Sequence, residues 1–238
     1  MLTSRLSTIA LIGALVAAGI VVLAGPLHRF GVPFGTVFSA MQIAAIAAAA
    51  FAILGIIALI LAFARKRPKT AAIAAILIGG AGFLAPASMA AQAGNLPFIH
   101  DITTDTDDPP AFVDVVPLRA DAPNPAAYDP AVAEQQKAGY PDIVPLHLDM
   151  PPEEAFARAL AAVEESGWEL HAAERDEGRI EATATTAWFG FKDDVVVRVR
   201  PESGGSVVDV RSKSRIGQSD LGKNAARIRD LLTRIETG

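Results

Sequence analysis

Residues 192–215 have the sequence KDDVVVRVRPESGGSVVDVRSKSR, and this stretch decides the fold of the C-terminal half of the chain. Two valine-rich runs, 192–200 and 206–215, flank turn residues at 202–205, which is the pattern of a β-hairpin. Centring the turn on 202–205 puts valine pairs on one face and pairs of opposite charge on the other. These pairs are Val199 with Val208, Val197 with Val210, Arg198 with Asp209, and Asp194 with Lys213.

Periodic segments on both sides of the hairpin predict the rest of an α+β domain core over residues 143–238. A helix should open at Pro151 and Pro152, with acids in its first turn, and end at Gly167. A last helix should start at Ser219, a good N-cap, and continue to about Thr237. Further strands are expected at 143–148, 168–175 and 179–187. This order predicts an antiparallel sheet of about five strands, covered on one face by two helices.

The segment 95–142 is rich in proline and is expected to belong to the same domain. Ten of the sixteen prolines lie between Pro109 and Pro152. Because proline removes a backbone donor and fixes φ, this density predicts extended chain that lies on the domain or leads into it. A short helix is expected over residues 130–137 only.

The N-terminal region, residues 1–94, contains three apolar runs, at about 6–24, 38–64 and 70–90. A helix needs roughly 20 apolar residues to cross about 30 Å of hydrocarbon, so the first two runs predict membrane spans. The third is shorter and ends in small residues, and it follows the basic loop 65–69. It is interpreted as a third span, with an internal signal peptide cleaved near Ala90 as the alternative.

Charge is segregated along the chain and predicts its orientation. Residues 1–96 hold six Lys/Arg and no acid, whereas residues 97–238 hold 15 Lys/Arg and 26 Asp/Glu. Arg5 and the four cations at 65–69 predict a cytoplasmic N-terminus, which with three spans places the C-terminal half outside. We therefore expect a bacterial inner-membrane protein with a periplasmic domain. The alanine-rich second span is expected to pack within the bundle or against a partner.

Several function classes are excluded or disfavoured. The chain has no cysteine, so it has no disulfide, thiol catalyst or iron–sulfur cluster, and the acidic C-terminal half disfavours nucleic acid. The spans contain no ionisable group, which disfavours transport. No common catalytic motif is present, and Asn224 stands where a P-loop at 217–224 needs Ser or Thr. No cofactor and no catalytic residue are predicted.

Two polar clusters are candidate binding sites. The acidic run that contains Asp101, Asp105, Asp107 and Asp108 is a weak candidate for Ca²⁺, because ordinary turns use the same residues. The second cluster lies at the end of the last strand and the start of the last helix, and an anion such as a lipid headgroup would suit it. Its residues are Arg198, Arg211, Ser212, Ser214, Arg215, Ser219 and Asp220. A solvated face of paired charges is the simpler interpretation of its arginines.

Several of these segments resemble the domain of unknown function 1499 (DUF1499) family over roughly residues 95–238. The resemblance is carried by 100–104 (HDITT), 109–112 (PPAF), 191–195 (FKDDV) and 211–222 (RSKSRIGQSDLG), with Asn224, Arg227 and Ile228. It implies no reaction or cofactor. It implies that the Arg-Ser-x-Ser-Arg strand and the Ser-Asp-Leu-Gly turn are family features.

The predicted function is a non-enzymatic binding or assembly module that is tethered to the membrane. Its expected partners are membrane lipids and an envelope protein. A hydrolase-like enzyme that uses a serine or aspartate of residues 211–220 is one alternative. The other is an accessory subunit of a larger membrane complex, held through the second span.

Overall fold

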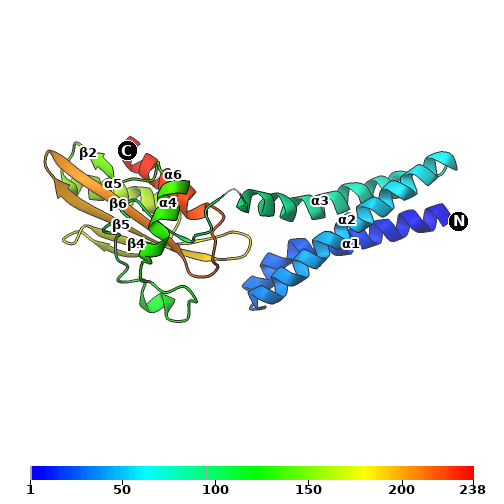
Figure 1. Ribbon diagram of the computed structural model, residues 1–238, viewed down its shortest axis with the longest axis horizontal. Helices are drawn as coiled ribbons and strands as arrows, with labels where there is room; N and C mark the ends of the chain where they lie inside the picture. Colours follow the sequence, from blue (N-terminus) through cyan, green and yellow to red (C-terminus); the bar gives the residue numbers. More distant parts are fainter. Residues whose placement is uncertain (1, 95) are drawn as a thin grey trace. The chain divides into compact units, whose positions relative to one another are not determined.

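The computed structural model describes residues 2–94 and 96–238 (Figure 1). The chain divides into two compact units. The helical unit comprises residues 1–94 with 187–190, and the sheet unit comprises residues 95–186 and 191–238. Each unit has its own buried apolar cluster.

Three long helices, which lie side by side in Figure 1, form the helical unit: α1 (Leu2–Arg29), α2 (Phe34–Ala64) and α3 (Thr70–Ala93). All three are long and apolar enough to cross a membrane. This confirms the three predicted apolar spans as helices. Each helix extends a few residues beyond its apolar run, and α3 continues through Pro86 and Ala90.

Small residues hold the three helices together. Ala10, Ala14 and Ala75 form a fully buried cluster, and Ala48 of α2 is also fully buried. In contrast, large side chains of α2 are exposed, and these are Ile43, Ile46, Ile53 and Ile60. The small face of α2 is therefore used within the bundle, and its bulky apolar face is exposed.

Replacing Gly79 with alanine is expected to weaken the packing of α3 on α2. A Cβ at Gly79 would lie 2.5 Å from the Ala48 carbonyl oxygen, whereas a Cβ at Gly80 would meet nothing within 4 Å. Gly79→Ala should therefore cost about 1–3 kcal/mol, because backbone atoms must move apart. Gly80→Ala is the matched control and should leave stability unchanged or raised. Thermal unfolding of both variants in detergent measures the difference, and equal melting temperatures would contradict it.

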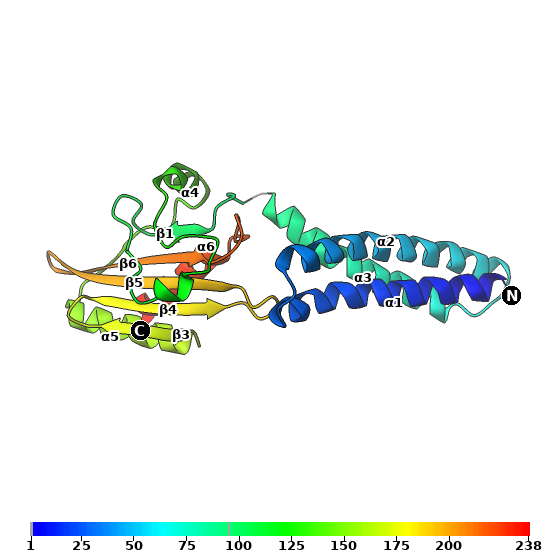
Figure 2. The same cartoon turned by 90° about the horizontal axis from the view of Figure 1, so that it is seen from below.

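The sheet unit has six strands among its described residues, all paired antiparallel. They are β1 (Asp101–Thr103), β2 (Leu146–Leu148), β3 (Glu169–Glu174), β4 (Arg179–Thr185), β5 (Lys192–Glu202) and β6 (Gly205–Ser214). The order is β1-β6-β5-β4-β3, as Figure 2 shows, and β2 also pairs with β6. The predicted α+β class is confirmed. The additional strand is β1, which lies in the segment predicted as extended.

The predicted hairpin register is correct. Val199 pairs with Val208 and Val197 with Val210 across β5 and β6. These valines pack against two helices, α5 (Pro152–Glu165) and α6 (Lys223–Thr237), through side chains that include Val163. Because alternate residues of a strand point to the same side, these valines share one face of the sheet. That face and the two helices enclose the domain core.

Residues 104–130, which we call the cover segment, lie over the opposite face of the sheet. Phe112 and Val115 of this segment are buried with Val196 of β5. The segment is rich in proline. It has no regular structure apart from short 3-10 turns at Pro117–Arg119 and Pro130–Val132. The short helix α4 (Ala133–Gly139) follows it, as expected. The predicted solvated face of paired charges is only partly correct. Arg198, Arg200 and Arg215 are partly exposed and paired with aspartates, whereas Arg211 and Lys213 are buried beneath the cover segment.

The predicted start of the last helix needs a correction. α6 begins at Lys223, after Gly222 in the left-handed conformation (φ 75°), and not at Ser219. The Asp220 carboxylate accepts hydrogen bonds from the backbone N–H groups of Gly222 and Asn224. The first turn is therefore capped by Asp220, and Gly222 supplies the positive φ that the chain needs there.

Candidate functional site

Two basic side chains of β6, Arg211 and Lys213, are buried around one carboxylate, that of Asp101 in β1. Arg211 donates to both Asp101 carboxylate oxygens at 2.8 and 2.9 Å, and Lys213 Nζ lies 2.9 Å from Oδ2. All three side chains are at most 3% exposed. Burial lowers the pKa of Lys213, although the negative charge of Asp101 acts in the opposite direction. The two cations also donate to carbonyl oxygens of the cover segment, at Pro110, Ala126 and Ala127.

A second buried carboxylate, Asp194 of β5, is held by two arginines. Arg119 of the cover segment and Arg215, next to β6, both donate to it, and so does the Thr183 hydroxyl at 2.6 Å. Burial alone would raise the pKa of Asp194, but these hydrogen bonds outweigh it and lower the pKa. Asp194 is thus an ionised structural group. Lys213, its register partner, contacts Asp101 instead, so the predicted Asp194–Lys213 ion pair is wrong.

Asp209 of β6 and Glu181 of β4 are two further carboxylates that are buried on this face of the sheet and paired with arginines. Arg198 and Arg200 both contact Asp209, which confirms the predicted Arg198–Asp209 pair. Arg179 contacts Glu181, whose oxygens also accept backbone N–H groups of the cover segment, at Val113 and Val115. Each buried carboxylate on this face therefore has cationic or N–H donors within the fold.

The sheet separates the residues that the sequence groups into one binding surface. Ser212 and Ser214 lie on the helix side, where both contact the Asn224 amide. The other members lie elsewhere: Arg198, Arg211 and Arg215 on the side of the cover segment, and Ser219 and Asp220 in the turn before α6. These seven residues do not form one continuous surface, and Arg211 is not accessible.

The acidic run 101–108 is organised as turns and ion pairs. Asp105 Oδ1 accepts from the backbone N–H groups of Asp107 and Asp108, an arrangement typical of aspartate in turns. Asp108 also contacts Arg198, and Asp101 is occupied by Arg211. Within residues 2–94 and 96–238, no group of three or more His, Asp or Glu side chains is arranged to hold a metal ion.

One contact between a hydroxyl group and an imidazole ring bears on the hydrolase alternative. His171 Nε2 lies 2.8 Å from the Thr183 hydroxyl, which donates its proton to Asp194. A nucleophilic hydroxyl must give its proton to a base that can accept it. Because the single Thr183 hydroxyl proton is donated to Asp194, His171 Nε2 can contact this hydroxyl only as a donor and is not placed as its base. This chain of contacts therefore favours a structural role.

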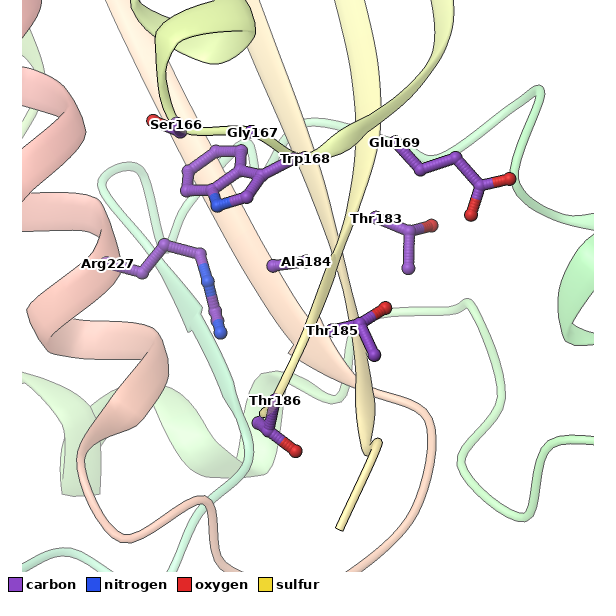
Figure 3. Close-up of a pocket in the computed structure, with 9 residues that line it drawn as sticks. All are labelled: Ser166, Gly167, Trp168, Glu169, Thr183, Ala184, Thr185, Thr186 and Arg227. Atoms are coloured by element: carbon purple, nitrogen blue, oxygen red, sulfur yellow. The ribbon is translucent and has the colours of Figure 1, made fainter. Parts of the chain in front are cut away.

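A cleft of about 340 Å³ opens where β3 begins and β4 ends (Figure 3). Its lining combines one aromatic ring, one guanidinium, hydroxyls and backbone. The residues are Ser166, Gly167, Trp168, Glu169, Thr183, Ala184, Thr185, Thr186 and Arg227. None of the candidate binding residues named from the sequence lines this cleft; Arg227 does, and the family resemblance had included it without assigning it a role.

Arg227 of α6 is positioned by a polar network and keeps donors to spare. It donates to Ser212 and Asn224 and forms an ion pair of 2.7 Å with Asp193. These contacts use three of its five N–H groups, which leaves two for a ligand. Its guanidinium lies 6.0 Å from the Trp168 ring, and Figure 3 shows both groups bordering the same open space. The cleft is thus equipped to bind, and its cation is already neutralised by Asp193.

Comparison with known proteins identifies one family. The family model described as "Protein of unknown function (DUF1499)" matches residues 101–235, which is more than half of the chain. The match covers β1, the cover segment, the cleft and almost all of α6, and it confirms the resemblance seen in the sequence. Neither the curated proteins nor the solved structures gave a match.

Proposed function

The chain belongs to the DUF1499 family, and from its structure we propose that it is a membrane-tethered binding module rather than an enzyme. Three apolar helices anchor it, and the sheet unit presents the binding site. The family description assigns no activity. The proposal therefore rests on what the side chains of this chain do in the fold.

The observation that carries the proposal is the state of the buried carboxylates. Asp101, Asp194, Asp209 and Glu181 are all held by arginine, lysine or backbone donors. General acid–base catalysis needs a group whose pKa lies near the working pH and which can reach a substrate. These carboxylates are committed to joining the cover segment to the sheet. Burial raises the pKa of Asp220, but this carboxylate accepts the backbone N–H groups of Gly222 and Asn224 at the start of α6. The cleft at β4 offers groups that recognise a ligand without a reactive centre.

The proposed orientation follows the basic residues. Four cations lie between α2 and α3, at residues 65–69, and the positive-inside rule assigns that loop and the N-terminus to the cytoplasm. With three spans, the sheet unit then lies on the other side, in the periplasm of a bacterium with two membranes. Membrane lipids surround the spans, and the sheet unit binds a component of the envelope.

Native mass spectrometry of the full-length protein, gently solubilised from its own membrane, tests this function. We expect a polypeptide that starts at Met1 and retains either a small-molecule mass or a partner protein. A bare polypeptide in every charge state would contradict a stable binding role. A polypeptide that starts near Ala91 would contradict the three-helix tether.

A further inference from the structure

The end of strand β4 has an unpaired edge at the cleft. The pairing of β3 with β4 begins at Glu169 opposite Thr183, whereas β4 continues to pair with β5 as far as Thr185 opposite Lys192. Residues 184–185 therefore have a neighbouring strand on one side only. The cleft lies on the other side.

The backbone groups of Thr185 point into this open side. The N–H of Thr186 donates to the Phe191 carbonyl on the β5 side at 2.8 Å. In an antiparallel ladder the N–H and C=O of one residue point to the same side, and those of the next residue point to the opposite side. The N–H and C=O of exposed Thr185 therefore face away from β5, where an added strand would find them.

The other edges of the sheet are protected against strand addition. β3 has an irregular register between Leu170 and Ala172, and it carries Glu169 and Glu174 at its two ends. A bulge and charged ends are common devices that keep an edge strand from pairing. On the far side of the sheet the edge strands are β1 and β2, which have only three residues each, and the outward N–H and C=O of Thr103 in β1 are bonded to the Gln136 side-chain amide. These protective features do not extend to the edge of β4 at Thr185.

Side chains around the cleft suit a peptide that is neutral or basic. Glu164, Glu165 and Glu169 are exposed beside or within the cleft lining, and Figure 3 shows the Glu169 carboxylate directed away from Arg227. Arg227 is paired with Asp193, so the cleft has no unpaired cation to attract an anion. The sheet unit as a whole carries many more acids than bases.

We propose that the cleft binds an extended, neutral or basic peptide segment of an envelope partner, which adds to β4 at Thr185. The peptide backbone pairs with the N–H and C=O of Thr185, and one of its side chains packs against Trp168. The unused N–H groups of Arg227 donate to a peptide carbonyl. This inference rests on the proposed function and names the ligand class of the same domain.

A matched pair of substitutions tests the backbone pairing. Thr185→Pro removes the outward N–H and places a ring at the edge, whereas Thr185→Ala removes the hydroxyl and keeps the N–H. Since that N–H does not face β5, the proline leaves the β4–β5 ladder intact, as it does at strand edges. The probe is an array of capped hexapeptides that alternate valine and threonine and contain one lysine, applied to full-length protein in detergent.

We expect the wild type and Thr185→Ala to bind the same peptides and Thr185→Pro to bind them at least about tenfold more weakly. Versions of the bound peptides with methylated backbone nitrogens should lose a comparable factor on the wild type. This ligand-side control does not depend on whether the proline variant folds. Array peptides that do not bind the wild type, or that bind regardless of methylation, would overturn the inference.

The outcomes also separate this inference from the proposed function. If the purified protein retains a non-peptide molecule and binds none of the array, it remains a binding module and the peptide assignment fails. If it retains nothing and binds none of the array, both proposals fail. Array binding that depends on Thr185 and on the peptide N–H groups supports both.

Discussion

Replacing Asp101 with alanine is expected to destabilise the sheet unit by about 3–5 kcal/mol, the usual cost of removing one partner from a buried ion pair. The substitution leaves Arg211 and Lys213 charged beneath the cover segment with no carboxylate between them. Urea unfolding of the full-length protein in detergent, followed by tryptophan fluorescence, measures the change. A loss below about 1 kcal/mol would show that the Asp101 carboxylate is not needed to keep the two cations buried.

The pH dependence of the Asp101→Ala variant checks the cause. Burial lowers the pKa of Lys213 in the folded protein, and removing Asp101 takes away the charge that opposes this effect. The unfolded state then binds a proton more readily than the folded state, so stability rises with pH up to the ordinary lysine pKa of about 10.5. The deficit of the variant should therefore shrink towards pH 10.

Glu154→Ala is the matched control for the Asp101 experiment. Glu154 pairs with Arg158 on the surface of α5, one helical turn away, and both side chains are substantially exposed. An exposed pair at this spacing contributes a few tenths of a kcal/mol. A loss as large as that of Asp101→Ala would show that any lost ion pair destabilises this domain, whatever its burial.

The elements whose signal is local were predictable from the sequence. The register of β5 and β6 follows from the two-residue period of Val197 and Val199 and from one glycine-rich turn, and a slip by one residue would bury charges. The spans follow from apolar composition alone. Neither inference needs any knowledge of segments that lie far away in the chain.

The buried charges and the cleft could not be predicted in this way. Charged residues that alternate with valines along a strand, such as Asp194 and Arg198, give the same sequence pattern whether they face water or a covering segment. The deciding partner, Arg119, lies 75 residues before Asp194, in a proline-rich stretch without periodicity. The cleft likewise depends on α6 bringing Arg227 next to Trp168. Strand β1 has three residues, too few for a period to be recognised.

Replacing Asp194 with asparagine is expected to cost about 3 kcal/mol at neutral pH and to remove part of the acid sensitivity of the domain. Arg119 and Arg215 would lose their counter-charge, although the amide oxygen can still accept a hydrogen bond. Unfolding free energies measured from pH 7 to pH 3 report both effects. Equal stability of the two proteins at pH 7 would contradict the assignment.

The sign of the pH effect follows from the lowered pKa of Asp194. Burial opposes the ionised form, but hydrogen bonds from Arg215, Thr183 and Arg119 outweigh burial, so the folded pKa lies below the unfolded value of 3.8. The stabilisation is complete above that unfolded value and is lost as the pH falls through the folded pKa. The difference between wild type and Asp194→Asn should thus be largest at neutral pH and narrow below about pH 4.

Asp142→Asn separates burial from ion pairing as the origin of this acid sensitivity. A hydrogen bond from Arg229 lowers the pKa of Asp142 as well, but this pair lies at the surface, with 43% and 55% of its side chains exposed. Solvent screens such a pair, so the substitution should change stability little at any pH. If Asp142→Asn reduced the loss of stability at low pH as much as Asp194→Asn does, ion pairing anywhere on the domain would account for the acid sensitivity. If only Asp194→Asn reduced that loss, the acid sensitivity would come from the carboxylate beneath the cover segment.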